Sequence, residues 1–169
     1  MDTFQRAVQK ARTSSFRLWL LNKALHWKIP FNKPHGIKIT AITDDGFEVT
    51  VPYIRRNYNH IKGTHACCLA TAGEYVVGLS LLRKLSSDKY RLIMERMDIR
   101  YTYQAKTAVT VSFGLTDQFL QQNVFGPLAG NDAIFVEFTT CIKDGEGRTV
   151  CEAKTRWQIK AWDKVRTKI

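Results

Sequence analysis

The sequence predicts an α+β domain in which a mostly antiparallel sheet packs around one long buried helix. The helix is indicated by the sixteen residues from Cys67 to Leu82, in which the only charged side chain is Glu74. Small residues recur there at steps of three and four, and a face of Ala and Gly lets a sheet approach closely. The sheet is indicated by alternating apolar and polar residues in two segments before this helix and four after it.

The chain before the buried helix predicts one helix, a loop and a hairpin. Residues 3–26 have apolar residues broadly on one helical face, and Pro30 and Pro34 then punctuate a loop. Strands are expected at 37–41 and 47–53, because apolar residues occupy every second position in both. The intervening Asp44-Asp45-Gly46 contains an Asp-Gly pair, which favours a tight hairpin turn. The buried helix should then begin after Thr64 as N-cap and end near Leu85.

Four strands are expected after the helix, at residues 96–103, 109–115, 134–142 and 151–161. Turns are indicated at 104–106 and at 143–147, where Asp144-Gly145 lies. The connection 117–132 is unusually long, and we expect it to contain one helical turn. It is rich in Phe119, Leu120, Val124 and Phe125, which predicts that it lines or covers an apolar pocket.

Length and composition indicate one domain of 169 residues with an ordinary hydrophobic content of 44%. The formal charge of +11 favours an anionic partner. Basic residues are denser near the end of the chain, at Lys154, Arg156, Lys160, Lys164, Arg166 and Lys168, and three of these share one exposed strand face. Nucleic acid is not favoured as a partner, since no recognition motif accompanies the charge. The first residues lack a signal pattern, and the apolar run is shorter than the ~20 residues that span a bilayer, so we expect a cytoplasmic protein without a membrane span.

The four cysteines, Cys67, Cys68, Cys141 and Cys151, show neither metal-ligand nor disulfide-framework spacing. We interpret them as small core residues, and we expect no metal and no resident cofactor. A Cys67 or Cys68 nucleophile with His65 as its base is disfavoured, because such close neighbours on a helix point apart.

A group of polar and small residues surrounds the start of the buried helix: Asn59, Gly63, His65-Ala66-Cys67, Glu74 and Gly78. This pattern resembles the hotdog-fold thioesterases of the phenylacetate-degradation type and their uncharacterised relatives. Those proteins carry an Asn, a Gly, then His-Gly-Gly, an acidic residue nine positions after the His, and a small residue four further on. Here His-Gly-Gly is replaced by His-Ala-Cys, Gly63 lies one residue nearer to His65, and Asn57 competes with Asn59.

The resemblance implies a hotdog fold, in which an antiparallel sheet wraps around the long central helix. The hotdog domain would span residues 35–169, and residues 1–34 would add an N-terminal helix and a linker. It further implies a homodimer or a dimer of dimers that hydrolyses an acyl-CoA or acyl-carrier thioester, with coenzyme A present only as part of the substrate. Glu74 would then be the general base or nucleophile, and Asn59 or His65 would position the carbonyl or the water.

The chemistry suits these positions. A helix start offers unpaired N–H groups and about half a positive charge, so the amides near Ala66 and Cys67 can polarise a thioester carbonyl. Glu74 lies about 12 Å further along the same helix, too far to reach the same bound atom. The family resolves this by dimerisation, in which the carboxylate of one subunit faces the helix start of its partner.

Each assignment has a structural alternative. Glu74 could pair with an Arg or His from a strand, and His65 could cap the helix. Asn59, or Asn57 in its place, could be a turn residue. Candidate contacts for the coenzyme A phosphates are Arg55, Arg56, Lys62, Arg83 and Lys84, although surface charge explains each equally well.

Two other functions remain open on the sequence alone. A non-catalytic hotdog module that binds an acyl thioester, or regulates a partner, fits the altered His-Ala-Cys turn. A basic nucleic-acid-binding protein fits only the charge, and predicts binding that weakens steeply with salt. Hotdog dehydratases, which also pair a His with an acidic residue, fit less well.

Overall fold

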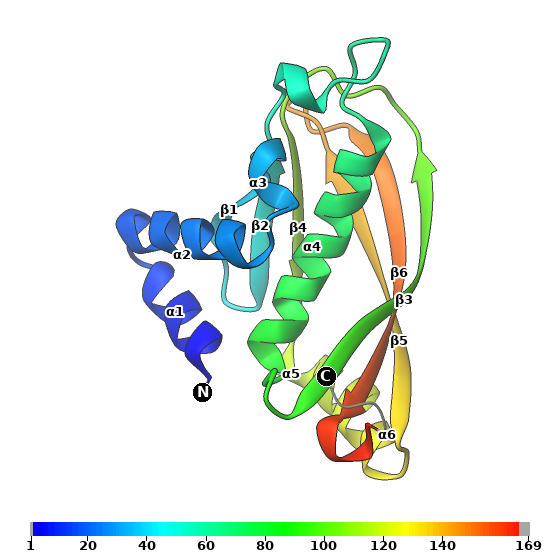
Figure 1. Cartoon of the computed structure of the whole chain (residues 1–169). Coiled ribbons are helices and arrows are strands. Elements are labelled where there is room, and N and C mark those ends of the chain that lie inside the picture. Colours follow the sequence, from blue (N-terminus) through cyan, green and yellow to red (C-terminus); the bar gives the residue numbers. More distant parts are fainter. Residues whose placement is uncertain (1, 166–169) are drawn as a thin grey trace.

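A curved six-stranded antiparallel sheet surrounds one long helix, α4 (Ala66–Lys84), in the computed structural model, which describes residues 2–165 (Figure 1). The strands lie in the order β1-β2-β4-β5-β6-β3, so that β1 and β3 form the two edges. Their bounds are β1 Lys38–Ile42, β2 Gly46–Val51, β3 Tyr90–Tyr101, β4 Val109–Gly114, β5 Ala133–Lys143 and β6 Thr149–Ala161. Two strands precede α4 and four follow it, as predicted, and the α+β class is confirmed.

Small residues let α4 approach the sheet closely. A Cβ atom at Gly73 would lie 3.0 Å from the Cβ of Ala153 and 3.2 Å from Oγ1 of Thr140. The hydroxyl of Ser80 lies 2.9 Å from the carbonyl oxygen of Val76 and 3.2 Å from that of Phe113 in β4. Within residues 2–165, α4 alone has the length and apolar composition of a membrane span, but more than half of it is buried inside the fold. Its apolar character is therefore explained by the core.

The N-terminal region contains three helices, and the prediction of a single helix over 3–26 was wrong. Helix α1 (Thr3–Ala11) and helix α2 (Ser15–Lys28) are separated at Ser14, whose side chain accepts a hydrogen bond from the amide of Arg17. A serine that caps a new helix competes with continuation of the preceding one. A short helix, α3 (Asn32–His35), follows and leads into β1.

The two edges of the sheet differ in what covers them. Helix α2 covers β1, because the side chain of Asn22 donates to the carbonyl of Ile39 (2.9 Å) and accepts from its amide (2.8 Å), as a neighbouring strand would. The twelve-residue strand β3 pairs only with β6 among the described residues. Its inward side chains, Leu92, Met94, Met97 and Ile99, remain half-buried. An uncovered edge of this length is suited to pairing with another chain.

The connection between β4 and β5 is more helical than predicted. It consists of α5 (Asp117–Leu120), the π-helical segment η2 (Gln121–Phe125) and α6 (Gly126–Ala129). Leu120 and Val124 are buried in the core, and the rings of Phe119 and Phe138 lie 5.8 Å apart. The segment lies beside the C-terminal end of α4 (Figure 1). Whether it covers an acyl pocket stays a prediction.

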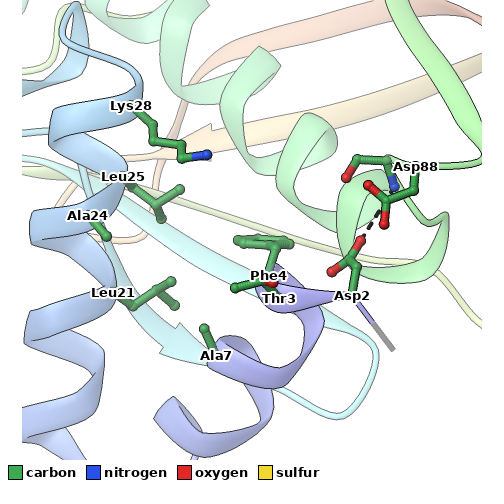
Figure 2. Close-up of a pocket in the computed structure, with 10 residues that line it drawn as sticks. Asp2, Thr3, Phe4, Ala7, Leu21, Ala24, Leu25, Lys28 and Asp88 are labelled. Carbon is green, nitrogen blue, oxygen red and sulfur yellow. Dashed lines mark hydrogen bonds between the residues drawn. The ribbon is translucent and has the colours of Figure 1, made fainter.

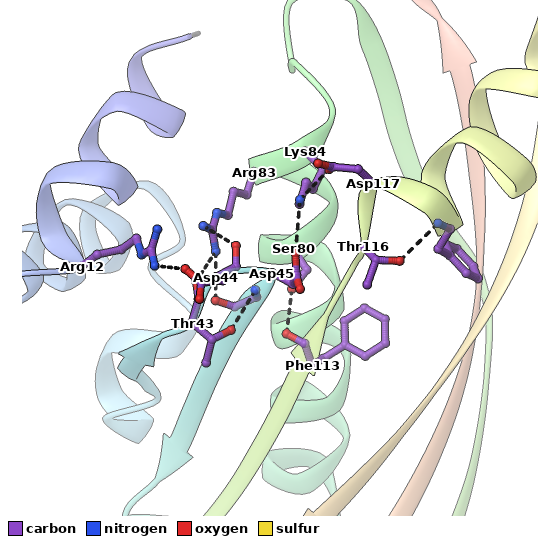
Figure 3. Close-up of polar contacts among 12 residues, drawn as sticks. Arg12, Thr43, Asp44, Asp45, Ser80, Arg83, Lys84, Phe113, Thr116 and Asp117 are labelled. Carbon is purple, nitrogen blue, oxygen red and sulfur yellow. Dashed lines mark hydrogen bonds and ion pairs between the residues drawn. The ribbon is translucent and has the colours of Figure 1, made fainter.

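Two basic residues fasten the C-terminal end of α4 to its surroundings (Figure 3). The guanidinium of Arg83 donates to the carbonyls of Thr43 (2.8 Å), Asp44 (2.9 Å) and Gly46 (3.1 Å) in the β1–β2 turn. The ammonium of Lys84 lies 2.7 Å from Asp117 and 3.6 Å from Asp45. Positive groups at a helix C-terminus also complement its dipole. This turn forms at the Asp-Gly pair, as predicted.

The close approach at Gly73 generates a stability prediction. Gly73→Leu should lower the free energy of unfolding by about 1–3 kcal/mol, because the added atoms must displace β5 and β6. Gly130→Leu is the matched control, since a Cβ at that position meets nothing within 4 Å. Urea unfolding of both variants measures the difference. Equal midpoints would contradict the close packing of α4 on the sheet.

Candidate functional site

The start of α4 is capped by His65, and the predicted N-cap, Thr64, was wrong. Nδ1 of His65 accepts a hydrogen bond from the amide of Cys67 at 3.1 Å, which requires that this ring nitrogen carry no proton. Thr64 instead donates its backbone amide to the carbonyl of Ala105 (2.8 Å). Its buried hydroxyl has no hydrogen-bond partner within residues 2–165.

Because of this cap, only one of the two amides that the sequence assigned to an oxyanion site already has an acceptor. The amide of Cys67 is occupied by the ring of His65. The amide of Ala66, the first residue of α4, has no acceptor in the described part of the chain. Tyr101, at the end of β3, also contacts this helix start, because its hydroxyl donates to the carbonyl of Ala66 at 3.2 Å. Of the two amide donors expected at this helix start, only that of Ala66 has no acceptor within residues 2–165.

The two competing asparagines have different structural roles. Asn57, in the short helix η1 (Arg55–Asn57), is fully buried and donates its side-chain amide to the carbonyls of His35 and Pro52, both at 2.9 Å. Its backbone carbonyl accepts the amide of His65 at 2.7 Å, so it anchors the start of α4. The carboxamide oxygen of Asn59 accepts the amides of Ile61 (3.1 Å) and Gly63 (2.8 Å), which organises the turn before the helix.

The geometry of that turn accounts for the glycine at position 63 and for the backbone conformation of Lys62. Gly63 is buried, and a Cβ there would come within 2.6 Å of Cγ of Gln104. Lys62 has a positive φ of 60°, and its carbonyl accepts the hydroxyl of Tyr53. The side-chain amide of Asn59 donates no hydrogen bond in residues 2–165, so this group is oriented by the turn and remains available.

Glu74 is a half-buried carboxyl group without a partner. No hydrogen bond or ion pair involves its side chain anywhere in the described chain, so the strand Arg or His considered as its structural partner is not found there. Burial raises the pKa of Glu74 above its ordinary value. An unpaired acidic group with a raised pKa on a central helix is typical of a functional site.

The surroundings of Glu74 include Trp157 of β6, which lies within the strand predicted at 151–161. A Cβ at Gly78 would lie 3.2 Å from the Trp157 indole and 3.8 Å from Oε1 of Glu74. Gly78 therefore leaves room for the ring of Trp157 beside the helix. Trp157 is buried, and its indole N–H has no acceptor within residues 2–165. Buried indole N–H groups ordinarily have one.

The basic candidates separate into two groups. Arg55, Arg56 and Lys62 are exposed and flank the start of α4, where Arg56 donates to the carbonyl of Pro34 at 3.0 Å. Arg83 and Lys84 lie at the opposite end of the nineteen-residue helix and are engaged there. Their assignment to a phosphate near His65 is therefore not supported by their position.

Of the row predicted to be exposed on β6, Lys154 is exposed, whereas Arg156 and Lys160 are half-buried, and part of the row is paired. Lys154 lies 2.7 Å from Glu137, and Arg156 lies 2.5 Å from Glu95. Arg166 and Lys168, which belong to the same predicted group, lie outside the described residues.

The cysteines are only partly core residues. Cys68 and Cys151 are buried, whereas Cys67 and Cys141 are exposed, so the prediction of four core positions was wrong for two. Burial raises the pKa of the Cys68 thiol, which disfavours the nucleophilic thiolate. Within residues 2–165, no group of His, Cys, Asp and Glu side chains is placed to hold a metal ion.

An apolar hollow of about 380 Å³ lies away from Glu74, between α1, α2 and the turn after α4 (Figure 2). Its lining includes Phe4, Leu21 and Leu25, and Asp2, Lys28 and Asp88 also border it. The carboxylate of Asp2 accepts the amide of Ser87 at 3.4 Å. The hollow lacks the candidate residues at the start of α4, so we do not assign the chemistry to it.

Comparison with known proteins identifies a family match. A family model described as "Domain of unknown function (DUF4442)" matches residues 17–159. The match begins inside α2 and ends near the end of β6, so it contains every proposed site residue. A search of the curated proteins found no match.

Several solved structures similar to this chain are named as thioesterases. A protein of unknown function from Pseudomonas aeruginosa, described as a probable thioesterase, shares 21% identity over 84% of this chain and 94% of its own, with a TM-score of 0.77. A mutant thioesterase from the same organism shares 13% identity over 85% and 94%, with a TM-score of 0.66. A thioesterase mutant from Staphylococcus aureus shares 14% over 78% and 98%, with a TM-score of 0.61. These similarities show the fold, which is the hotdog fold.

The environment of Glu74 predicts a pH-dependent stability. Because its folded pKa is raised, the carboxyl group is neutral in both states below its ordinary pKa of 4.5, and stability falls as pH rises through the folded pKa. Glu74→Gln should therefore raise Tm at about pH 8 and leave it nearly unchanged at about pH 4.

Glu137→Gln provides the control, because Lys154 lowers the pKa of Glu137 and no gain is expected there. Calorimetry at the two pH values measures the effect. A lower Tm for Glu74→Gln at both values would indicate that the carboxylate has a stabilising partner.

Proposed function

Because this chain belongs to the DUF4442 family and has the hotdog fold, we propose that it hydrolyses an acyl-CoA or acyl-carrier thioester as a homodimer. The observation that carries the proposal is Glu74, a half-buried carboxyl group of raised pKa on the central helix, which has no partner among residues 2–165. A group of this kind is costly to keep in a fold unless it does chemistry. The cytoplasmic location expected for such an enzyme stays a prediction.

In this mechanism Glu74 acts as general base. Its carboxylate removes a proton from water while the water oxygen attacks the thioester carbonyl carbon. The carbon–sulfur bond then breaks, the acid is released, and the proton passes to the departing sulfur. A raised pKa makes Glu74 a stronger base than an exposed carboxylate, at the cost of a smaller ionised fraction. Direct attack by the carboxylate on the carbonyl carbon uses the same residue: the carbon–sulfur bond breaks, the thiol leaves, and water cleaves the resulting anhydride to release the acid and restore Glu74.

The carbonyl oxygen is stabilised at the start of α4. The amide of Ala66, which has no acceptor within residues 2–165, and the positive end of the helix dipole provide the donor and the charge. The amide of Cys67 becomes a second donor if the ring of His65 releases it. The free side-chain amide of Asn59 positions either the carbonyl or the water.

The dimer brings these groups together. Glu74 lies about 12 Å from the start of its own helix, so one chain cannot place both groups on one atom. The uncovered edge of β3 supports pairing with the same strand of a second copy, because such an edge has unpaired backbone groups. Each site then combines Glu74 of one subunit with the helix start of the other. Arg55, Arg56 and Lys62 border that helix start and would contact the coenzyme A phosphates.

The second candidate function is a non-catalytic module that binds an acyl thioester. The bond between His65 and the amide of Cys67 favours it, since it occupies one of the two expected oxyanion donors. The two functions differ in turnover and not in binding.

A substrate panel tests the role of Glu74. We expect thiol release from at least one of short, medium, long or aryl acyl-CoA substrates, and a loss of about 10²- to 10⁴-fold in kcat for Glu74→Gln. Glu137→Gln removes an exposed carboxylate from β5 and should retain activity. Turnover that is equal in Glu74→Gln and the wild type would exclude Glu74 from the reaction. Binding without turnover on every substrate would favour the non-catalytic module.

The shared site can be tested by mixing two inactive variants. Ala66→Pro deletes the free amide while keeping the helix, because proline is well tolerated at the first helical position and His65 is already extended. It should retain Tm and lose about 10²-fold in kcat. Unfolding and refolding it together with Glu74→Gln should restore about a quarter of wild-type activity, since half of the dimers then contain one intact site. No recovery in verified mixed dimers would place both groups in one subunit.

A further inference from the structure

Helix α2 has apolar residues on two opposite sides, and residues 2–165 cover only one of them. Leu21 and Leu25 face the core and are buried. On the other side, Phe16, Trp19, Leu20 and Trp27 follow helical spacing and have exposed fractions of 67%, 53%, 45% and 80%. We call these four residues the outer stripe. A helix that is apolar on both sides is expected to be covered on both.

The outer stripe is ordered by its own contacts. The rings of Phe16 and Trp19 stack with centroids 6.0 Å apart. The ammonium group of Lys23 lies 5.4 Å from the centroid of the Trp19 ring, so a positive charge lies within the stripe. Exposed tryptophans flanked by lysine are typical of helices that lie in the interface of a bilayer.

The charge around the stripe has one sign. Between residues 3 and 43 the chain contains eight Lys and Arg residues and no Asp or Glu. This run accounts for most of the formal charge of +11. It includes α1, α2, α3 and all of β1, which adjoin one another at one side of the domain (Figure 1).

Basic side chains border the stripe on both flanks. On one flank, Lys10 and Arg17 line an apolar hollow of about 330 Å³ together with Leu20 of the stripe and the small residues Ala7 and Ala24. On the other flank, Lys23 and Lys38 line a hollow that also includes Trp19. Apolar surface therefore lies between two groups of cations that have long, flexible side chains.

We propose that the outer stripe of α2 binds the surface of an anionic lipid bilayer. The helix lies parallel to the membrane, with Phe16, Trp19, Leu20 and Trp27 in the boundary between headgroups and acyl chains. Lys10, Arg17, Lys23 and Lys38 reach the phosphates, because their long apolar stems extend toward water and headgroups while their charges stay outside the hydrocarbon. The helix lies on the membrane and does not cross it.

Charge complementarity favours this occupant over the two alternatives. A second copy meeting the first through the same stripe would bring Lys23 and Arg17 against their own counterparts, which costs free energy. A nucleic acid would use the cations, but no nucleic-acid recognition motif accompanies them in the sequence. A bilayer uses both the apolar stripe and the cations.

The position of α2 leaves the proposed dimer interface free. Helix α2 is fastened to β1 by Asn22 and by His26, whose Nε2 lies 2.7 Å from the carbonyl oxygen of Ile37. Strand β3 is the opposite edge of the sheet. Membrane binding through α2 therefore does not depend on the proposed thioesterase activity.

Co-sedimentation of the full chain with vesicles tests the proposal. We expect binding to vesicles of phosphatidylcholine mixed with phosphatidylglycerol, little binding to phosphatidylcholine alone, and weaker binding at high salt. Tryptophan emission should shift to shorter wavelength on binding. Trp157 is buried and Trp162 donates to the carbonyl of Ser87, so the shift reports on Trp19 and Trp27.

Two variants separate the apolar and charged contributions. Trp19→Ala/Trp27→Ala should weaken vesicle affinity by at least about tenfold, and Lys10→Glu/Arg17→Glu should abolish the preference for anionic lipid. The matched controls are Phe135→Ala, which removes an exposed aromatic ring on β5, and Lys106→Glu/Lys143→Glu, which reverses two exposed charges elsewhere. Both controls should bind like the wild type, and circular dichroism should show every variant folded.

Three results would overturn the proposal. The first is a wild-type chain that does not sediment with anionic vesicles. The second is vesicle binding that Trp19→Ala/Trp27→Ala and Lys10→Glu/Arg17→Glu both retain. Displacement of the chain from vesicles by an oligonucleotide counts in the same way if Trp19→Ala/Trp27→Ala still binds that oligonucleotide normally. The third is a loss of oligomer mass in Trp19→Ala/Trp27→Ala by analytical ultracentrifugation, which would assign the stripe to a second copy of the chain. None of these results depends on thioester hydrolysis.

Discussion

The contact on which the structure depends is the close packing of α4 against the curved sheet. Gly73 allows it, because any larger side chain there would displace Ala153 and Thr140 on the facing strands. Both ends of the helix are then fixed by specific bonds. Asn57 anchors its start through the amide of His65, and Arg83 anchors its end through three carbonyls of the β1–β2 turn. The helix is therefore fixed in both depth and direction.

A helix held in this way keeps costly groups where they are. Glu74 stays half-buried without a partner in the described chain. The ring of Trp157 shares the space beside Gly78 with Glu74, and its indole N–H has no acceptor within residues 2–165. Each group would lower its free energy by moving toward water, and the surrounding packing prevents this. Preorganised groups of this kind are what a catalytic site needs, since they do not have to be rearranged when the substrate binds.

The two edges of the sheet differ in whether another element covers them: α2 covers β1, whereas β3 is uncovered within residues 2–165. At β1 the side chain of Asn22 satisfies the backbone of Ile39, and α2 thereby closes that edge while turning its outer stripe toward solvent. At β3 the edge is uncovered in the described chain. We infer that one side of the domain meets lipid and the other meets a second subunit.

The sequence by itself determined the buried helix, the two strands before it and the four after it, and the turns of the β1–β2 and β5–β6 hairpins, because apolar periodicity and turn residues such as Asp45-Gly46 act locally. It also identified Glu74, since a lone charge in an apolar helix is visible without a structure. Only the tertiary structure decided that His65 and not Thr64 caps α4, that Ser14 divides the N-terminal helix, and that Trp157 lies near Glu74. Each of these depends on competition between nearby polar groups for one amide, or on the approach of strands distant in sequence. The apolar residues of α2 were visible in the sequence, but which of its two sides the core covers follows from how α2 packs against β1.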